Sequence, residues 1–232
     1  MKCMWCKKQL YHELTPSSLF QLRSIEPFDR CLECSHRLEE LKGHLSCPMC
    51  SRKQSHDQVC ADCQSWQQIY PERVFHHQSL FHYDGIIKEW LIHFKYLRDY
   101  RLKSFLRPEL QRELLKCSRD KTIVPIPISP ASLETRGFNQ VTAILEDASI
   151  PYSNLLQSFR DGKKQSAKSK EERMESGQCF LVDLDQLHLL SGEEVILVDD
   201  VYTTGRTLNH ARDALLASCR QLKIETWSIA RS

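Results

Sequence analysis

Two neighbouring carboxylates and the small hydroxyl residues that follow them form the part of this sequence best suited to chemistry. Asp199 and Asp200 come directly after the apolar, β-branched run at residues 195–198, which predicts a buried strand. A loop with threonines and Gly205 follows, and then a pattern typical of an amphipathic helix. Strand, polar loop and helix in this order bring backbone N–H groups and a helix N-terminus against a phosphate. The apolar face of the predicted helix carries Leu208, Ala211, Leu215 and Leu216.

The residue types in this stretch favour a particular ligand. Threonine hydroxyls donate hydrogen bonds to phosphate oxygens, and Gly205 permits a positive φ and a close approach of the backbone. Asp199 and Asp200 have the wrong charge for a phosphate, but their oxygens suit the hydroxyls of a diol or a Mg²⁺ ion. A diol near a phosphate is a ribose 5-phosphate. The alternative is a buried strand that ends in a solvated turn with a threonine cap, which a lone pair of aspartates would favour.

A second set of reactive groups lies at the other end of the chain. Eight of the eleven cysteines occur in the first 63 residues as four pairs, each with two residues between its members. Two such pairs complete a tetrahedral four-thiolate site, so four pairs predict two structural zinc ions. The alternatives are disulfides, which a reducing compartment disfavours, a redox pair, which would not occur four times, and an iron–sulfur cluster. The pairs are Cys3/Cys6, Cys31/Cys34, Cys47/Cys50 and Cys60/Cys63.

The spacing of these pairs leaves their combination open. Sequential use gives two zinc ribbons, whereas alternating use gives a cross-braced module. We expect sequential use, because the last two pairs lie close together and indicate one small hairpin. His44 and His56 lie nearby, but each site already has four thiolates, so we expect both at the surface. The segment contains so little apolar sequence that its fold should depend on the metal.

Composition limits the class of protein. The chain has 232 residues, enough for one ordinary domain and a small module, and its formal net charge is +2. Such a charge demands neither a nucleic acid nor a membrane as partner. No apolar stretch approaches the length of a membrane span, and the first eight residues lack the apolar core of a signal peptide. We therefore expect a cytosolic protein.

The segments between the cysteines and the carboxylates must hold them in place. Residues 64–82 lead out of the cysteine-rich part, and we expect their aromatic side chains to pack that part against the rest. An amphipathic helix is predicted to begin near Asp84. Pro108 marks a break or a new helix start, and a second helix is predicted over residues 109–116. The packing aromatics are Trp66, Tyr70, Phe75, Phe81 and Tyr83, and the first helix presents Ile87, Trp90, Leu91, Phe94 and Leu97.

The second half of the chain alternates strands and helices. Residues 122–127 predict the first core strand, and Pro125 and Pro127 restrict it to an edge or a strand end. A helix is expected over residues 138–147, and residues 223–230 alternate as a final strand.

A further phosphate contact is predicted ahead of the helix over 138–147. Residues 129–137 predict a loop that ends in Arg136 and Gly137. Arg136 can bind a phosphate with its planar guanidinium, and Gly137 admits a tight turn.

The string at residues 195–207 resembles the 5-phosphoribosyl-1-pyrophosphate (PRPP) signature of type I phosphoribosyltransferases, and every signature position is filled. The resemblance implies that Asp199 and Asp200, as the catalytic pair, hold the ribose 2′- and 3′-hydroxyls. It also implies that PRPP binds together with Mg²⁺ and that the following loop surrounds the 5′-phosphate. The implied loop residues are Thr203, Thr204, Gly205, Arg206 and Thr207.

Three pieces together resemble the ComF family: residues 124–127, residues 136–140 and the PRPP signature. That family unites an N-terminal cysteine-rich zinc module with a phosphoribosyltransferase domain, and it is linked to DNA uptake in naturally competent bacteria. The resemblance covers nearly the whole chain, including the stretch around Lys95. It implies an α/β fold with a mainly parallel sheet, preceded by a small double zinc ribbon. Arg136 and Gly137 then belong to the pyrophosphate-side loop.

Residues 160–176 are rich in basic and poor in apolar side chains, which predicts a mobile loop. By resemblance this is the flexible loop that closes over PRPP, and Arg160, Gln165 and Arg173 match polar positions common in the family. A basic loop of this kind is equally suited to contact a DNA backbone.

Basic side chains could also line a groove for single-stranded DNA. Such a groove would run between the predicted first helix and the basic loop, with Trp90 or Tyr96 stacking on bases. The alternatives are a solvated charged face and, for Trp90, a place in the core. The basic groups are Lys88, Lys95, Arg98 and Arg101 in the helix and just beyond it, and Lys163, Lys164, Lys168 and Lys170 in the loop.

The sequence therefore predicts a double zinc ribbon at residues 1–68 and a phosphoribosyltransferase-like domain at 69–232, with a helical lead-in at 84–116 and a core at 122–232. We expect a ComF-like protein of natural competence that binds PRPP and aids uptake of transforming single-stranded DNA. The partners implied by the family are the competence helicase and other DNA-uptake proteins, which would recruit a cytoplasmic protein to the inner face of the membrane. The alternatives are an active phosphoribosyltransferase of nucleotide metabolism, for which no acceptor is identified, and a zinc-ribbon nucleic-acid-binding protein without catalysis.

Overall fold

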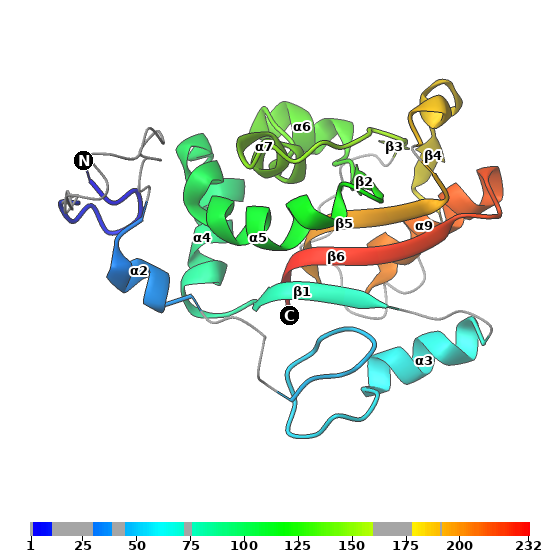
Figure 1. Cartoon of the computed structure of the whole chain (residues 1–232), viewed down its shortest axis with the longest axis horizontal. Coiled ribbons are helices and arrows are strands. Elements are labelled where there is room, and N and C mark those ends of the chain that lie inside the picture. The colour runs from blue at the N-terminus through cyan, green and yellow to red at the C-terminus, as the bar shows by residue number, and fades with distance from the viewer. Residues whose placement is uncertain (1, 11–29, 39–44, 72–75, 160–177, 191) are drawn as a thin grey trace.

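A parallel four-stranded sheet forms the centre of the protein (Figure 1). The computed structural model describes residues 2–10, 30–38, 45–71, 76–159, 178–190 and 192–232. The strands lie in the order β1, β6, β5, β2, and every neighbouring pair is parallel, which confirms the predicted α/β fold. Their bounds are His77–His82 for β1, Thr122–Pro125 for β2, Glu194–Tyr202 for β5 and Lys223–Arg231 for β6.

The central strand β5 is buried, as its apolar sequence predicts. Its residues 195–198 are at most 3% exposed. Strand β2 pairs with β5 at one edge of the sheet. Pro125 has no N–H to donate, but among the described strands β2 has no neighbour on its outer side whose hydrogen bonds would be interrupted. The edge position expected from the prolines is therefore confirmed.

Side chains that alternate along β5 enter two separate cores. Ile196 and Val198 belong to the core on what we call the first face of the sheet, which several helices cover. Val195 and Leu197 belong to the core on the second face. The elements of the first face are α4 (Gly85–Lys95), η1 (Tyr100–Leu106), α5 (Arg107–Cys117) and α7 (Gln140–Asp147), and those of the second are α9 (Arg206–Ser218), β3 (Leu156–Ser158) and β4 (Phe180–Val182).

Helix α4 begins where its sequence predicts. The Asp84 carboxylate accepts a hydrogen bond of 2.6 Å from the Gly85 N–H and caps the helix. Trp90 is fully buried, so it belongs to the core and does not stack on a ligand. Leu97 is 63% exposed, contrary to the prediction, because α4 ends at Lys95 before the apolar stripe reaches it.

Two predicted connecting segments contain regular structure instead. Residues 64–82, expected only as a joining segment, contribute the edge strand β1, which pairs with β6. Residues 129–137, expected as a loop, contain helix α6 (Pro130–Arg136). The signals for α6 were local ones: Ser129 caps it, Pro130 opens it, and Gly137 ends it with a φ of +82°.

The N-terminal part contains two small units of the same local build. Four residues after the first cysteine of each unit comes a residue with positive φ, Lys7 in one and Ser51 in the other. Its N–H donates a hydrogen bond to the carbonyl of that first cysteine. In each unit the third cysteine, Cys31 or Cys60, precedes a helix as its cap residue. The helices are α2 (Leu32–His36) and α3 (Ala61–Ile69). The division of the chain between residues 68 and 69 stays a prediction.

The remaining described element is η3 (Leu184–Leu189), which connects β4 to β5. No helix in the described segments combines the length and the apolar character needed to cross a bilayer.

Candidate functional site

The two predicted carboxylates lie near the carboxyl end of β5, at the edge of a parallel sheet where such folds bind ligands. Asp200 is buried and Asp199 is half-buried. The Asp199 side chain accepts a hydrogen bond of 2.8 Å from the Asp200 N–H. Both carboxylates are therefore held in place before any ligand arrives.

The loop after β5 turns sharply at Gly205, which has a φ of +79° and is the cap residue of α9. A Cβ atom at this position would lie 2.1 Å from the Tyr202 hydroxyl oxygen, so only glycine fits. Gly205 has no side chain with which to cap the first turn of α9, so the N–H groups of that turn can bind another acceptor. Thr203 is exposed, Thr204 is buried, and Arg206 and Thr207 are half-buried.

Asp200 is paired with a cation from the first face. The Lys95 ammonium group, at the last residue of α4, lies 2.8 Å from one Asp200 carboxylate oxygen. The other oxygen accepts a hydrogen bond from the Gln140 side-chain amide. The Lys95 and Asp200 side chains are only 14% and 9% exposed. A ligand that needs both Asp200 oxygens must therefore displace Lys95 or Gln140.

Arg136, which Gly137 follows as the cap residue of α6, reaches the same site through Gln140. Arg136 is the last residue of α6, and its guanidinium donates a hydrogen bond of 2.7 Å to the Gln140 side-chain oxygen. The guanidinium also lies over the Tyr96 ring, 5.9 Å from its centroid. Arg136, Gln140 and Asp200 thus form one hydrogen-bonded chain between the two loops that the sequence predicted to meet the ligand.

The two neighbouring carboxylates have opposite pKa shifts. Burial, and then the charge of Asp200, raise the pKa of Asp199 to about 7. Burial alone would raise the pKa of Asp200 as well, but the Lys95 ammonium group and the Gln140 hydrogen bond together hold it below its usual value. Near neutral pH Asp200 is therefore an acceptor only, whereas Asp199 also exists in a form that donates a hydrogen bond.

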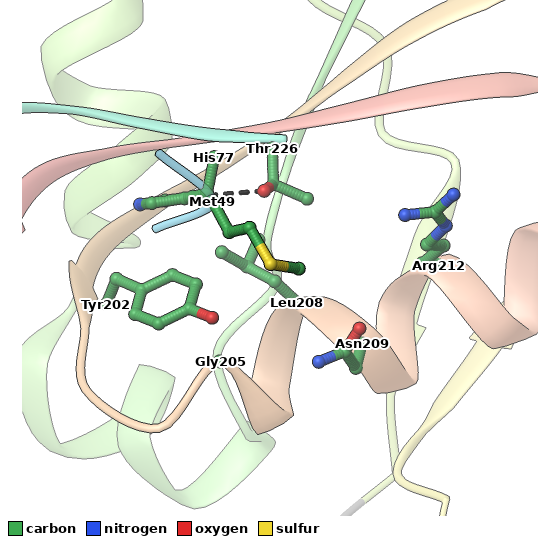
Figure 2. A pocket seen from close by; sticks show the side chains of 8 residues that line it. All are labelled: Met49, His77, Tyr202, Gly205, Leu208, Asn209, Arg212 and Thr226. Atoms are coloured by element: carbon green, nitrogen blue, oxygen red, sulfur yellow. Dashed lines mark hydrogen bonds between the residues drawn. The ribbon is translucent and has the colours of Figure 1, made fainter. Parts of the chain in front are cut away.

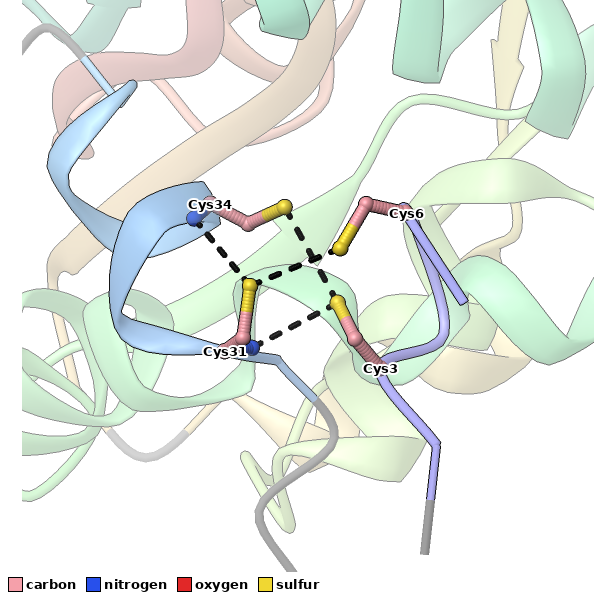
Figure 3. Close-up of side chains that lie close together, drawn as sticks. All are labelled: Cys3, Cys6, Cys31 and Cys34. Atoms are coloured by element: carbon pink, nitrogen blue, oxygen red, sulfur yellow. Dashed lines mark hydrogen bonds between the residues drawn. The ribbon is translucent and has the colours of Figure 1, made fainter. Parts of the chain in front are cut away.

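The eight N-terminal cysteines form two groups of four, which confirms the sequential combination of the pairs. In Figure 3 the thiols of Cys3, Cys6, Cys31 and Cys34 point toward one another from two segments. The second group is Cys47, Cys50, Cys60 and Cys63. We call these the first and the second cysteine cluster.

The geometry of both clusters fits a tetrahedral metal ion. Four sulfurs about 2.3 Å from one zinc ion lie about 3.8 Å from each other. The Cys3 and Cys34 sulfurs are 3.8 Å apart, those of Cys6 and Cys31 3.5 Å, and those of Cys50 and Cys60 3.6 Å. These thiols are not joined in disulfides. The donor set is therefore that of a structural four-thiolate site.

The second cluster lies directly against the candidate ligand loop. Trp66, three residues after Cys63 on α3, donates its indole N–H to the Thr204 carbonyl at 2.6 Å. The Arg231 guanidinium donates to the Cys50 sulfur at 3.5 Å and to the Tyr202 carbonyl at 3.2 Å. A hydrogen bond from Cys63 and the Arg231 charge lower the pKa of the Cys50 thiol to about 4.

A small pocket marks the border between the second cluster's segment and α9 (Figure 2). Met49 and His77 line it from one side, and the Tyr202 ring and the start of α9 line it from the other. The His77 and Tyr202 rings lie 4.1 Å apart between centroids. Burial, together with the charge of Arg231, lowers the pKa of His77, so this ring is neutral. The predicted packing of the cysteine-rich part through Trp66 and Tyr70 is observed here, since Tyr70 donates its hydroxyl to Asp213 of α9 at 2.9 Å.

Comparison with known proteins identifies the family of this chain. The model of the phosphoribosyl transferase domain matches residues 131–231. Competence protein ComFC of Bacillus subtilis (strain 168) is 32% identical over 234 residues, which cover 99% of this chain and 95% of that protein. The chain belongs to the ComFC family. ComFC of Streptococcus pneumoniae is 31% identical over the full length of both proteins.

A more distant relative and a solved structure complete the comparison. Competence protein F of Haemophilus influenzae is 24% identical and covers 86% of this chain and 90% of its own length. A hypoxanthine phosphoribosyltransferase from Staphylococcus aureus has 16% identity and a TM-score of 0.31, over 57% of this chain and 65% of that one. The predicted membership in a competence family with a phosphoribosyltransferase domain is confirmed by the ComFC relatives and the domain match.

Sequence reasoning missed several residues of this ComFC site. Lys95 lies outside the matched domain and was predicted to line a DNA groove, with a solvated charged face as the alternative, but the structure places its ammonium group on Asp200. Gln140 lies in the family motif at residues 136–140 but was given no role of its own, and Arg231 carries no local signal. Each acts through a partner far away in the sequence. The predicted flexible-loop residues Arg160, Gln165 and Arg173 lie outside the described residues, as do Lys163, Lys164, Lys168 and Lys170.

Proposed function

We propose that this protein binds PRPP with Mg²⁺ at the carboxyl ends of β2 and β5 and acts in natural competence, in the uptake of transforming single-stranded DNA. The observation that supports this most strongly is the pair Asp199 and Asp200 beside the uncapped start of α9, in a member of the ComFC family. The carboxylates suit the ribose hydroxyls, and the helix N-terminus suits the 5′-phosphate.

The proposed roles follow the chemistry of each group. Asp199 and Asp200 bind the ribose 2′- and 3′-hydroxyls, and they are the catalytic pair if the protein transfers the ribosyl group. Arg136 and Gly137 border the pyrophosphate, where a guanidinium offsets its charge. Thr203, Thr204, Gly205, Arg206 and Thr207 surround the 5′-phosphate, and Arg160, Gln165 and Arg173 belong to a loop that covers the ligand.

The ligand would bring its own metal ion to the site. Mg²⁺ bound with PRPP would offset much of the pyrophosphate charge. The chain's own part is to orient the ribose through the buried carboxylates and to hold the departing pyrophosphate beside Arg136. Attack at ribose C1 also needs an acceptor, and pyrophosphate release in the presence of candidate bases tests whether one is used.

We further propose that each cysteine cluster binds one structural zinc ion. Each cluster offers four sulfur ligands at separations that suit zinc, and most of these thiols are buried. These features favour a closed structural zinc site over a catalytic metal site, which would keep an open position for a ligand. Metal analysis of the purified full-length protein should give two zinc ions per chain.

The proposed role in DNA uptake rests on the family and on a basic surface. Lys88, Arg98 and Arg101 are exposed at α4 and just beyond it, although Arg101 pairs with Asp99. The proposed partners are single-stranded DNA, the competence helicase and other DNA-uptake proteins, with the protein in the cytoplasm at the inner face of the membrane. If phosphate contacts hold the DNA, a plot of the logarithm of the binding constant against the logarithm of the salt concentration should have a slope of about −0.7 per contact.

One set of titrations tests the two halves of this proposal. Calorimetry with PRPP and Mg²⁺ should show one binding site per chain. A fluorescent single-stranded oligonucleotide should bind at low salt, and saturating PRPP should weaken that binding if both ligands share basic residues. If PRPP does not bind, the ligand assignment is wrong, and if DNA does not bind at low salt, the protein acts in competence through other proteins.

A further inference from the structure

The helix α3 connects the second cysteine cluster to the candidate ligand loop. Cys63 lies in α3, and Trp66 follows one helical turn later. Trp66 is 6% exposed, and its indole N–H donates to the Thr204 carbonyl, which directly precedes the Gly205 turn. Because a helix is rigid, a metal ion that fixes Cys63 also fixes the donor that holds this carbonyl.

Arg231 makes a second connection between the second cluster and the loop. This last residue of β6 is only 3% exposed. Its guanidinium contacts the Cys50 sulfur, the Tyr202 carbonyl and the Tyr202 ring, whose centroid lies 4.6 Å from the guanidinium carbon. One planar cation thus joins a sulfur of the second cluster to the residue where β5 becomes the loop.

The edge strand β1 adds a third contact between the same two regions. The His77 N–H donates to the Met49 carbonyl at 2.9 Å, and the Ser51 hydroxyl donates to the His77 carbonyl at 2.8 Å. The His77 ring then packs on Tyr202. The turn between Cys47 and Cys50 is therefore fastened to the sheet next to the ligand loop.

We propose that Trp66 and Arg231 are positioning residues, through which the metal-filled second cluster holds Tyr202–Gly205 in the shape that binds the phosphate of a phosphoribosyl ligand. This inference rests on the proposed function. A metal-bound thiolate accepts hydrogen bonds more strongly than a thiol, and groups around a metal site fix the orientation of what they contact. Loss of this metal ion loosens both connections to the loop.

The first cluster provides the matched control, because its contacts go elsewhere. Trp5 lies next to Cys6, and its ring packs on His93 of α4 and Phe105 of η1, with centroid distances of 5.3 and 5.7 Å. The same substitution, tryptophan to phenylalanine, can therefore be made beside each cluster. Only the one beside the second cluster removes a donor to the ligand loop.

The first experiment compares Trp66→Phe with Trp5→Phe in the full chain. Phenylalanine keeps an aromatic ring at position 66 but removes the N–H donor. We expect Trp66→Phe to weaken binding of PRPP with Mg²⁺ about two- to tenfold, as for the loss of one hydrogen bond. Trp5→Phe should leave the affinity within about twofold. Metal analysis must show two ions per chain in both variants, so that a change in affinity reports on the loop.

The second experiment uses Arg231→Lys, which keeps the charge but cannot bridge two acceptors with a planar fork. We expect this variant to bind PRPP and ribose 5-phosphate more weakly than wild type by a similar factor, since both carry the 5′-phosphate. Binding of pyrophosphate alone, which the proposed function places at Arg136, should be unchanged. A general loss of structure would weaken the binding of all three ligands equally.

The third experiment reverses the direction of the coupling. If the second cluster's metal strengthens ligand binding, the ligand must strengthen metal binding by the same factor. In equilibrium competition with a chelator, one of the two metal ions should therefore be retained up to a higher chelator concentration when ribose 5-phosphate is saturating, and the other should be lost at an unchanged chelator concentration. Trp66→Phe should reduce this protection.

The outcomes separate this inference from the proposed function. If wild-type protein binds neither PRPP nor ribose 5-phosphate, the proposed function fails. If wild type binds PRPP, but Trp66→Phe and Arg231→Lys bind it equally well with both metal ions retained, the inference is wrong and the proposed function stands. Protection of both metal ions alike by ribose 5-phosphate would also overturn the inference.

Discussion

The two cysteine clusters have the same local build but pack into different cores. Cys3 and Cys34 belong to the core on the first face of the sheet, with α4, η1 and α5. The second cluster belongs to the core on the second face, with the interior of β5 and with α9. In Figure 1 the helices α2 and α3, which follow the third cysteine of each cluster, lie on different sides of the molecule.

From this difference we infer that a small cysteine module takes its role from what it packs against. The first cluster is fastened to the lead-in helices by the buried ion pair between Arg30 and Glu109. The second is fastened to the ligand loop by Trp66 and Arg231. We therefore expect the first cluster to affect mainly stability and the second to affect both stability and ligand binding.

The largest effect is expected from removing one metal ligand in each cluster. Cys60→Ser should reduce the metal content from two ions to one and make PRPP binding too weak to measure, because the loop loses its support. Cys34→Ser should also lose one ion but should retain PRPP binding. Metal analysis and calorimetry on the same samples check both results.

Circular dichroism is the control for these cysteine variants. The sheet and its helices should remain folded in both, since β2, β5 and β6 pair with one another without help from the cysteines. Equal loss of PRPP binding in Cys34→Ser and Cys60→Ser would break the distinction between the two clusters.

A somewhat smaller effect is expected from the anchor of the first cluster. The Arg30 and Glu109 side chains are each only 9% exposed, so Arg30→Ala leaves a buried carboxylate without its partner. Unfolding free energy should fall by about 3 kcal/mol, as measured by denaturant titration. The PRPP affinity should not change. A loss of stability below about 1 kcal/mol would show that this anchor does not hold the cluster.

Helix α4, against which the first cluster packs, also supplies Lys95 to the ligand site. The comparison of the two clusters therefore includes the pair of Lys95 and Asp200. Lys95→Met leaves Asp200 with only its Gln140 hydrogen bond, and we expect a loss of about 2 kcal/mol in unfolding free energy. Asp200→Asn in the same background should recover most of it, which a double-mutant cycle measures. Independent effects of the two substitutions would contradict the ion pair.

The smallest effect concerns the contrast between the two carboxylates. The folded state keeps a proton on Asp199 between about pH 4 and pH 7, because its pKa is raised to about 7, whereas the unfolded chain has lost that proton. Unfolding free energy should therefore fall as pH rises through this window. Asp199→Asn removes the fall, so the variant should gain stability relative to wild type as the pH rises from 4 to 8. Thermal unfolding at several pH values tests this, and parallel curves for both proteins would refute it.

The sequence predicted features that depend on local pattern. The spacing of the cysteines predicted both clusters, and the closeness of the last two pairs favoured their sequential combination. The apolar run before Asp199 predicted the buried strand, Pro125 restricted β2 to an edge or a strand end, and Gly205 predicted a turn with positive φ. Each of these signals acts within a few residues, so one sequence suffices to detect it.

The missed features depend on contacts between distant residues or on weak local signals. Lys95 pairs with Asp200, and Trp66 bonds to Thr204, although more than a hundred residues separate the two members of each pair. The sequence around these residues contains no signal that identifies the partner. Strand β1 is short and polar at its start, so only its pairing with β6 makes it a strand. Helix α6 had cap signals at both ends, but seven residues gave too little periodicity to distinguish it from a loop.

Calorimetric titration of PRPP with Mg²⁺ is the most direct test of the central claim, that the carboxyl end of β5 binds a phosphoribosyl ligand. Wild-type protein and the exposed control Asp185→Asn should each bind one PRPP per chain. The double variant Asp199→Asn/Asp200→Asn should lose this binding while its far-UV dichroism stays unchanged, because both residues lie near a strand end. Absence of binding by wild type, or equal binding by the double variant, would contradict the account.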